Sequence, residues 1–297
     1  MRTFPISCLL ALLVVLIVSG CGPARNGGSP SNIIVALEPD RDPDAMLEDR
    51  KALEAFLAET FELRVQAIVP LTSTVISEGL RNGTIDVAYL SSTAATRLMD
   101  SGVIDILLAT EIEGKTSYQS YWLGRAGTPY ASIQDLAGKP IAFSSRTSTS
   151  GFLIPAWDLY KQELITLESG PEGFFGRGNV HFGVGYVSAV ERLLEGSVEA
   201  AAVSSYVFEQ DKHLSTDQRA QLKVIDTQGP VPSHVIVVRK SLDPEMKEQL
   251  REGILEMNTG ASDLRDRIFG APLVAVDGEA HIAVTREALE LMKNMEL

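Results

Sequence analysis

Two stretches of the chain repeat one pattern and decide the fold. Residues 80–92 read LRNGTIDVAYLSS and residues 193–205 read LLEGSVEAAAVSS, so the second copy starts 113 positions after the first (193 minus 80). In each copy a glycine follows a leucine-bearing segment, an acidic residue opens an apolar run, and two serines close it. A glycine in that place is typical of a left-handed helix cap before a strand. The repetition predicts two similar βαβ units, although two unrelated helix-to-strand turns would give the same pattern.

Strand and helix patterns alternate outward from the first copy. Residues 33–37 are an apolar run typical of a strand covered on both faces, and residues 44–60 carry a helical stripe. A strand at 63–69, a helix at 73–81 and a strand at 85–90 follow. This order predicts an α/β fold in two lobes with mainly parallel sheets.

We expect the chain to divide into consecutive parts joined by a two-strand hinge. A strand at 118–124 leads out of the first lobe, and an apolar strand at 235–238 leads back. The expected parts are a signal peptide (1–20), a Gly- and Pro-rich tether (21–31), the first part of lobe 1 (32–122), lobe 2 (123–233) and the return segment of lobe 1 with the C-terminal helices (234–297).

The N-terminus has the features of an export signal. Arg2 precedes an apolar run at 9–18 that is too short to span a membrane. Residues 18–21, VSGC, resemble a bacterial lipobox, in which Cys21 would carry a lipid; an ordinary signal peptide cut nearby is the alternative. The other cysteine, Cys8, would leave with the signal, so no disulfide is expected. We therefore expect an exported protein anchored to a membrane through Cys21.

Composition argues against several classes of function. The net charge of −13 and the lack of a basic cluster argue against nucleic acid as a partner. No nucleophile-elbow motif occurs, and the histidines are scattered without metal-ligand spacing. We therefore expect a monomeric binding protein with no metal, cofactor or catalytic residue. A hydrolase using Ser150 and His234 as a dyad is the less favoured alternative.

Residues 146–157, RTSTSGFLIPAW, place hydroxyl groups at the start of a helix. They follow a short strand at 141–143 and precede an apolar run with helical spacing. A helix N-terminus attracts anions through its free N–H groups, hydroxyls donate without adding charge, and Gly151 allows close backbone approach. Plain N-capping is the alternative. Pro155 has no N–H to bond back to Gly151, so we expect a loosened first turn.

The repeat also predicts where a cleft lies. Ligands of open α/β sheets sit beyond the carboxyl ends of the strands, where each copy places its two serines. Ser73 and Tyr186 each open a helix and are 113 positions apart (186 minus 73). The residues expected around the cleft are Thr72, Ser73, Ser91, Ser92, Ser204 and Tyr186.

Four segments resemble a known family. STSGFLIP at 148–155 resembles the Ser-Thr-Ser-Gly-Phe/Tyr-Leu-Val-Pro motif of the phosphate/phosphite/phosphonate-binding, PhnD-like substrate-binding proteins of ABC transporters. LRNGTIDVAYL at 80–90, SIQDLAGKPIAFSS at 132–145 and IVVRK at 236–240 resemble further segments of that family. The resemblance implies the type II periplasmic-binding fold, whose lobes close on a small anionic ligand, and a permease with its ATPase as partner.

The resemblance assigns roles to some residues and leaves others open. The family holds phosphonate oxygens with the hydroxyls of its Ser-Thr-Ser motif and the helix N-terminus, which implies this role for Ser148, Thr149 and Ser150. Gly151 completes the motif, and the first-lobe groups near residues 72–74 and 91–93 would complete the cage.

Four residues depart from the family pattern. Thr72 and Ser73 stand where the family often has Asp-Tyr, Tyr186 where a His is common, and His234 near an Asp that can meet a ligand amine. We therefore expect an oxyanion of the phosphonate, phosphite or phosphate type without an essential amine. Another small anion, such as a sulfonate or carboxylate, and a sensor in place of a permease remain alternatives.

Overall fold

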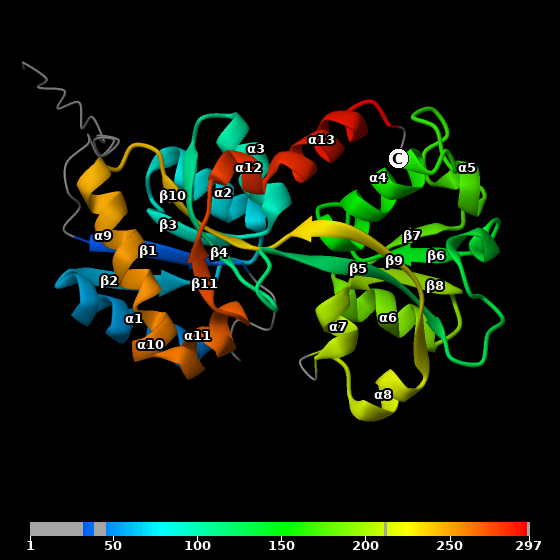
Figure 1. The fold of residues 1–297 in the computed structure, drawn as a ribbon, viewed down its shortest axis with the longest axis horizontal. Helices are drawn as coiled ribbons and strands as arrows, with labels where there is room; N and C mark the ends of the chain where they lie inside the picture. Colours follow the sequence, from blue (N-terminus) through cyan, green and yellow to red (C-terminus); the bar gives the residue numbers. More distant parts are fainter. Residues whose placement is uncertain (1–31, 39–45, 211–212, 296–297) are drawn as a thin grey trace, which may run out of the picture.

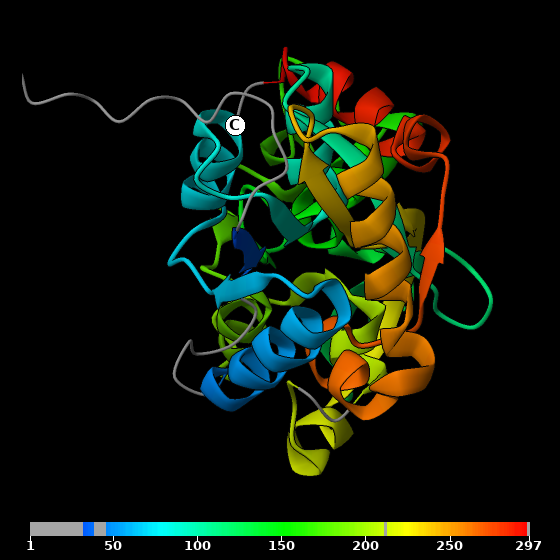
Figure 2. The ribbon, with the colours of Figure 1, turned by 90° about the vertical axis from the view of Figure 1, so that its left-hand side faces the viewer.

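The structure is a computed structural model that describes residues 32–38, 46–210 and 213–295. The expected signal peptide, tether and Cys21 lie outside the described residues. Two lobes lie side by side, each built around one sheet with helices on both of its faces (Figure 1). Figure 2 shows lobe 1 facing the viewer. No described helix combines the length and apolar character required to cross a bilayer.

The sheet of lobe 1 has the strand order β11-β4-β10-β3-β1-β2. β1 pairs in parallel with β2 and β3, whereas β10 is antiparallel to its neighbours β3 and β4. Its strands are β1 (Asn32–Leu37), β2 (Arg64–Ile68), β3 (Val87–Leu90), β4 (Ile104–Thr110), β10 (Val235–Arg239) and β11 (Leu273–Ala275).

The sheet of lobe 2 repeats this arrangement with the order β7-β6-β8-β5-β9. Here β6 pairs in parallel with β7 and β8, and β5 is antiparallel to β8 and β9. Its strands are β5 (Ser117–Arg125), β6 (Ile141–Phe143), β7 (Val180–Phe182), β8 (Ala200–Ser204) and β9 (Leu222–Pro232). The predicted two-lobed α/β class is confirmed. The sheets are mixed because each contains an antiparallel strand that enters from the other lobe, and in lobe 1 the edge strand β11 is antiparallel as well.

Helices cover both faces of each sheet because the strands alternate apolar side chains between two faces. In lobe 1, α1 and α9 pack over one face and α2 and α3 over the other. The helices of lobe 1 are α1 (Leu47–Phe61), α2 (Ser73–Asn82), α3 (Ser92–Asp100), α9 (Pro244–Leu255), α10 (Met257–Gly260), α11 (Ser262–Phe269) and α12 (Gly278–His281). Those of lobe 2 are η1 (Ile133–Leu136), η2 (Thr149–Leu153), α4 (Ile154–Lys161), α5 (Glu172–Phe175), α6 (Tyr186–Leu194), α7 (Ser205–Glu209) and α8 (Thr216–Ala220).

The structure bears out the sequence repeat. α2 begins at Ser73 and α6 at Tyr186, which keeps the spacing of 113 (186 minus 73). Gly83 and Gly196 follow these helices with φ of 77° and 78°, the left-handed conformation that glycine adopts without a steric penalty. Two equivalent βαβ units, and not a chance likeness of two turns, therefore account for the pattern.

Two chain crossings connect the lobes, from β4 to β5 and from β9 to β10. Ser233 joins them, since its Oγ lies 2.5 Å from the carbonyl oxygen of Thr110 and 3.0 Å from that of Thr116. The boundary expected between residues 122 and 123 falls inside β5, which pairs within the sheet of lobe 2 along its length. Both crossings thus meet at Ser233.

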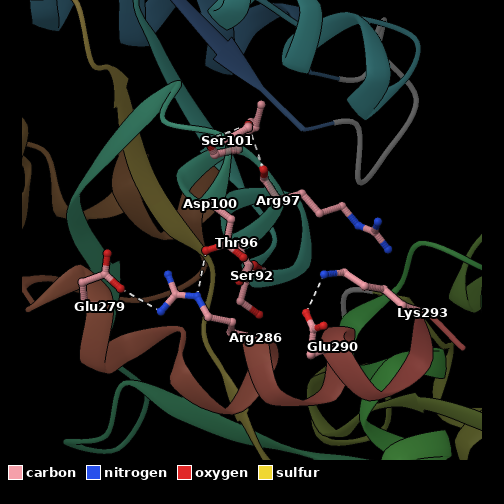
Figure 3. Close-up of polar contacts among 10 residues, drawn as sticks. Ser92, Thr96, Arg97, Asp100, Ser101, Glu279, Arg286, Glu290 and Lys293 are labelled. Carbon is pink, nitrogen blue, oxygen red and sulfur yellow. Dashed lines mark hydrogen bonds and ion pairs between the residues drawn. The ribbon is translucent and has the colours of Figure 1, made fainter.

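The C-terminal helix α13 (Ala283–Met292) contacts both lobes. Arg286 donates from Nε to Asp100 of α3 at 2.7 Å and from Nη1 to Glu279 of α12 at 2.7 Å (Figure 3). On the lobe 2 side, Leu289 of α13 shares a hydrophobic cluster with Trp157 of α4. α13 therefore bridges the two lobes.

Candidate functional site

A cavity of about 770 Å³ opens between the lobes. Its walls come from the starts of α2 and α3 in lobe 1 and the starts of η2 and α6 in lobe 2. The expected site residues that line it are Thr72, Ser73, Ser91, Ser148, Thr149, Tyr186 and His234. The expected residues Ser92, Ser150, Gly151 and Ser204 do not line it; all four are buried.

The hydroxyl-rich helix start in lobe 2 is a π-helical turn, η2, that leads into α4. The N–H of Leu153 donates to the carbonyl of Ser148 five residues earlier, at 3.0 Å. Pro155 has no N–H for the carbonyl of Gly151, which instead accepts the N–H of Ser144 at 3.0 Å. The loosened turn expected from Pro155 is therefore present as a π-turn.

Gly151 occupies a place where no side chain fits. A Cβ atom at this position would lie 2.4 Å from Cβ of Ser144 and 2.8 Å from Oγ of Ser148. Without it, the N–H of Gly151 donates to Oγ of Ser148 at 2.9 Å. Ser148 is thus the N-cap of the helix, and its hydroxyl hydrogen is still available for a ligand in the cavity.

Thr149 reaches across to lobe 1. Its Oγ1 accepts the backbone N–H of Thr93 at 3.2 Å and lies 2.8 Å from Oγ1 of Thr93 and 3.4 Å from Oγ of Ser92. This hydroxyl satisfies one of the free N–H groups at the start of α3. Ser92 faces Thr149, which explains why it belongs to the inter-lobe contact and not to the cavity wall.

Ser150 supports the cavity wall from behind. Its Oγ lies 2.8 Å from the hydroxyl of Tyr186, and its carbonyl accepts Oγ–H of Ser120 at 2.6 Å. The hydroxyl of Tyr118 lies 3.4 Å from the same Oγ. Burial, the largest effect, raises the pKa of Tyr118 well above its usual value, so its phenol keeps its proton. Ser150 therefore positions tyrosines that line the cavity.

The lobe 1 side contains a carboxylate that the sequence analysis did not identify. Glu38, directly after β1, accepts a hydrogen bond from Oγ of Ser73 at 2.5 Å and from the N–H of Ser91 at 2.7 Å. It is half-buried and lines the cavity. Its position beyond the carboxyl end of a buried strand is the signal that would have identified it.

Aromatic residues make up much of the remaining wall. The ring of Tyr89 lies 5.3 Å from that of His234 and 5.0 Å from that of Phe269 in lobe 1. In lobe 2, Tyr206 lies 5.8 Å from the rings of both Tyr118 and Tyr186. Apart from Tyr186 and His234, the sequence analysis missed these residues, because separate elements bring them together.

The charges around the cavity restrict how an anion is held. Glu38 and Glu191 line it, whereas none of the described lining residues is Lys or Arg. Within the described part of the chain, no cluster of acidic residues, His or Cys is suited to a metal ion. An anion would therefore be held by neutral donors, namely hydroxyls and helix N–H groups.

Comparisons with known proteins support this arrangement. The family model described as "ABC transporter, phosphonate, periplasmic substrate-binding protein" matches residues 35–277. The phosphate-import protein PhnD of Mycolicibacterium smegmatis is 24% identical over 253 residues, which cover 81% of this chain and 78% of that protein.

Two solved structures have a similar fold. XAC2383 of Xanthomonas citri, bound to chloride, has a TM-score of 0.76 at 20% identity and covers 89% of this chain and 99% of its own. PhnD1 of Prochlorococcus marinus, in complex with methylphosphonate, has a TM-score of 0.76 at 15% identity, with the same coverage of 89% and 99%. Both agree with the two-lobed arrangement seen here.

Proposed function

Because the chain belongs to the family of periplasmic phosphonate-binding proteins of ABC transporters, we propose that it captures a phosphonate, phosphite or phosphate-type oxyanion between its lobes. Proteins of this family are substrate-binding components of transporters and not enzymes. Because they are periplasmic, the chain acts outside the cytoplasm, together with a permease and its ATPase. The proposal extends to the N-terminus, where Cys21 carries a lipid that holds the protein at a membrane.

The observation that carries the proposal is the start of η2 in the wall of the cavity. Ser148 and Thr149 line the cavity where the helix exposes its first N–H groups. Tyr186, held by Ser150, adds a phenolic hydroxyl from the same lobe. Together these groups are neutral hydrogen-bond donors suited to the oxygens of an anion.

Capture proceeds by binding to lobe 2 and then closure. The oxyanion first meets Ser148 and the η2 N-terminus, and rotation about the crossings at Ser233 brings the start of α2 towards it. Thr72 and Ser73 of lobe 1 line the opposite wall and complete the cage. Closure favours binding because the closed state makes contacts with the ligand that the open state lacks.

Glu38 favours phosphorus oxyanions over the alternative anions. A monoanionic phosphonate, phosphite or phosphate keeps an O–H that can donate to this carboxylate, whereas an ionised sulfonate or carboxylate has no such hydrogen and is repelled. A Ser150–His234 dyad has no support, because Ser150 is buried behind the wall and its Oγ pairs with Tyr186.

Thermal denaturation of the full chain with a panel of anions tests the proposal. Phosphate, phosphite and methylphosphonate are compared with ethanesulfonate and acetate, each in large excess. A ligand at 100 times its Kd stabilises the folded state by about 2.7 kcal/mol, which raises Tm by several degrees. At least one phosphorus oxyanion should do so. A shift with only the sulfonate or the carboxylate would contradict the proposal.

A further inference from the structure

Three of the side chains that line the cavity are apolar and exposed. Leu71 is 83% exposed, Val184 is 97% exposed and Val187 is 45% exposed, and all three line the cavity. Leu71 precedes α2 and Val184 precedes α6, so the two hold equivalent places in the repeat (184 minus 71 is 113). We call Leu71 and Val184 the apolar lips. Exposed apolar groups gathered at one cleft indicate a surface that becomes covered.

The cavity is much larger than an inorganic oxyanion needs. Its volume is about 770 Å³, whereas one water requires about 10–15 Å³ of such space and a tetrahedral oxyanion only a few times more. Cavities of about 300–1,000 Å³ hold organic ligands of considerable size. An oxyanion at Ser148 and Thr149 therefore leaves most of the cavity for the rest of a ligand.

The lining of the remaining space is suited to an organic group. Aromatic rings of Tyr89, Tyr186 and Tyr206 line the cavity together with the apolar lips. Such rings and aliphatic side chains bind apolar surface, and they share the cavity wall with the polar side chains of Glu191, Gln210 and His213.

We propose that the ligand is an organic phosphorus oxyanion whose apolar substituent, about the size of a phenyl ring, lies between Leu71 and Val184. The inference rests on the proposed function, because it places the oxyanion head at Ser148 and Thr149. The head belongs either to a phosphonate or to a phosphate monoester, since both present the same terminal oxygens. The substituent packs against the apolar lips and buries their exposed side chains.

Isothermal titration of the full chain tests this inference with four probes: phosphite, methylphosphonate, phenylphosphonate and phenyl phosphate. We expect one or both phenyl compounds to bind at least about tenfold more tightly than methylphosphonate, because burying a phenyl group is favourable. Which phenyl compound binds more tightly identifies the type of head.

A double variant, Leu71→Ser with Val184→Ser, tests the position of the substituent. It should lose the preference for phenyl over methyl, so that the phenyl compounds and methylphosphonate bind it with similar Kd values. Val224→Ser is the matched control, because Val224 is 36% exposed but does not line the cavity. This control should keep the phenyl preference.

Three outcomes would overturn the inference. Equal affinity for methylphosphonate and both phenyl compounds would show that no substituent is recognised. An equal loss of affinity for all probes in the double variant would show that the apolar lips contact each other when the lobes close and do not contact a substituent. Unchanged affinities for all probes would show that the apolar lips contact a partner other than the ligand. Failure of all four probes to bind would instead contradict the proposed function itself.

Discussion

Asp86 and Arg239 form a buried ion pair, with Oδ1 of Asp86 2.8 Å from Nε of Arg239. The other carboxylate oxygen of Asp86, Oδ2, accepts a hydrogen bond from the N–H of Ile34 at 2.9 Å. Lobe 2 contains the equivalent pair, Glu199 and Arg125, at 2.7 Å. In each lobe the acidic residue comes shortly after the capping glycine. The arginine is the last residue of the strand that enters from the other lobe, which is β10 in lobe 1 and β5 in lobe 2. The repeat therefore includes an ion pair that ties the crossing strand to its new sheet.

Breaking the two pairs should have unequal effects on stability. The side chains of Asp86 and Arg239 are 0% and 4% exposed, whereas those of Glu199 and Arg125 are 26% and 28% exposed. Asp86→Asn leaves a buried charge uncompensated and should cost about 3–5 kcal/mol of unfolding free energy. The matched variant Glu199→Gln should cost about 1 kcal/mol, because solvent screens that pair. Urea denaturation measures the free energy of unfolding of both variants. Equal losses of that free energy would contradict the expectation that the more deeply buried pair contributes more.

The contact of Thr149 with Thr93 should stabilise the inter-lobe junction. Thr149→Val keeps the shape of the side chain but leaves the N–H of Thr93 without its acceptor, which should cost about 1–3 kcal/mol. Thr149→Ser retains the hydroxyl and serves as the control. Thermal denaturation of both variants checks this expectation. A valine variant as stable as the serine variant would mean that water replaces Thr149 at the start of α3.

Gly151→Ala should damage the site through packing. The new Cβ would meet Ser144 at 2.4 Å, so the η2 start must shift, at a cost of about 1–3 kcal/mol. The affinity for the oxyanion should fall as well, because the hydrogen bond from the N–H of Gly151 that positions the Ser148 hydroxyl is disturbed. Gly127→Ala is the control, since a Cβ there has no neighbour within 4 Å. Titration and denaturation of both variants decide the matter, and full affinity in Gly151→Ala would contradict the geometry.

His281 should make stability depend on pH. Burial, the larger effect, lowers its pKa below the ordinary 6.5, although Nε2 also bonds the carbonyl of Ser233 at 3.0 Å. The unfolded chain therefore takes up this proton at higher pH than the folded chain. The stability that the neutral form of His281 contributes is fully present above pH 6.5. It is lost as the pH falls through the pKa that His281 has in the folded chain.

The His281→Gln variant should lose this part of the pH dependence. Tm of the parent chain measured from pH 8 to pH 5 should fall more steeply than that of the variant. Parallel curves for the parent chain and His281→Gln would exclude His281 as the titrating group.

Local patterns in the sequence predicted most of the elements that position the cavity. The start of α2 at Ser73, the start of α6 at Tyr186 and the strand β6 follow from periodicity, capping and repetition, which are properties of neighbouring residues. The antiparallel places of β5 and β10 depend on how distant strands pair, so the expected mainly parallel sheets are mixed.

The candidate site was less predictable, because its chemistry depends on contacts between distant segments. Thr149 meets Thr93 at a separation of 56 residues, and Glu38 meets Ser91 at a separation of 53. No local pattern reports such contacts. The assignment of Ser148, Thr149 and Ser150 to ligand binding therefore stays a prediction, with Ser150 given a supporting place behind Tyr186.

The most direct test of the central claim is a titration of methylphosphonate and phosphite into the parent chain and the Ser148→Ala variant. Loss of the N-cap should cost about 1 kcal/mol of stability, so the variant should still be folded at 25 °C. We predict one-site binding to the parent chain, and at least about tenfold weaker binding to the variant, because a hydrogen bond to a charged ligand is lost. Equal affinity in both chains would contradict an oxyanion site at the start of η2.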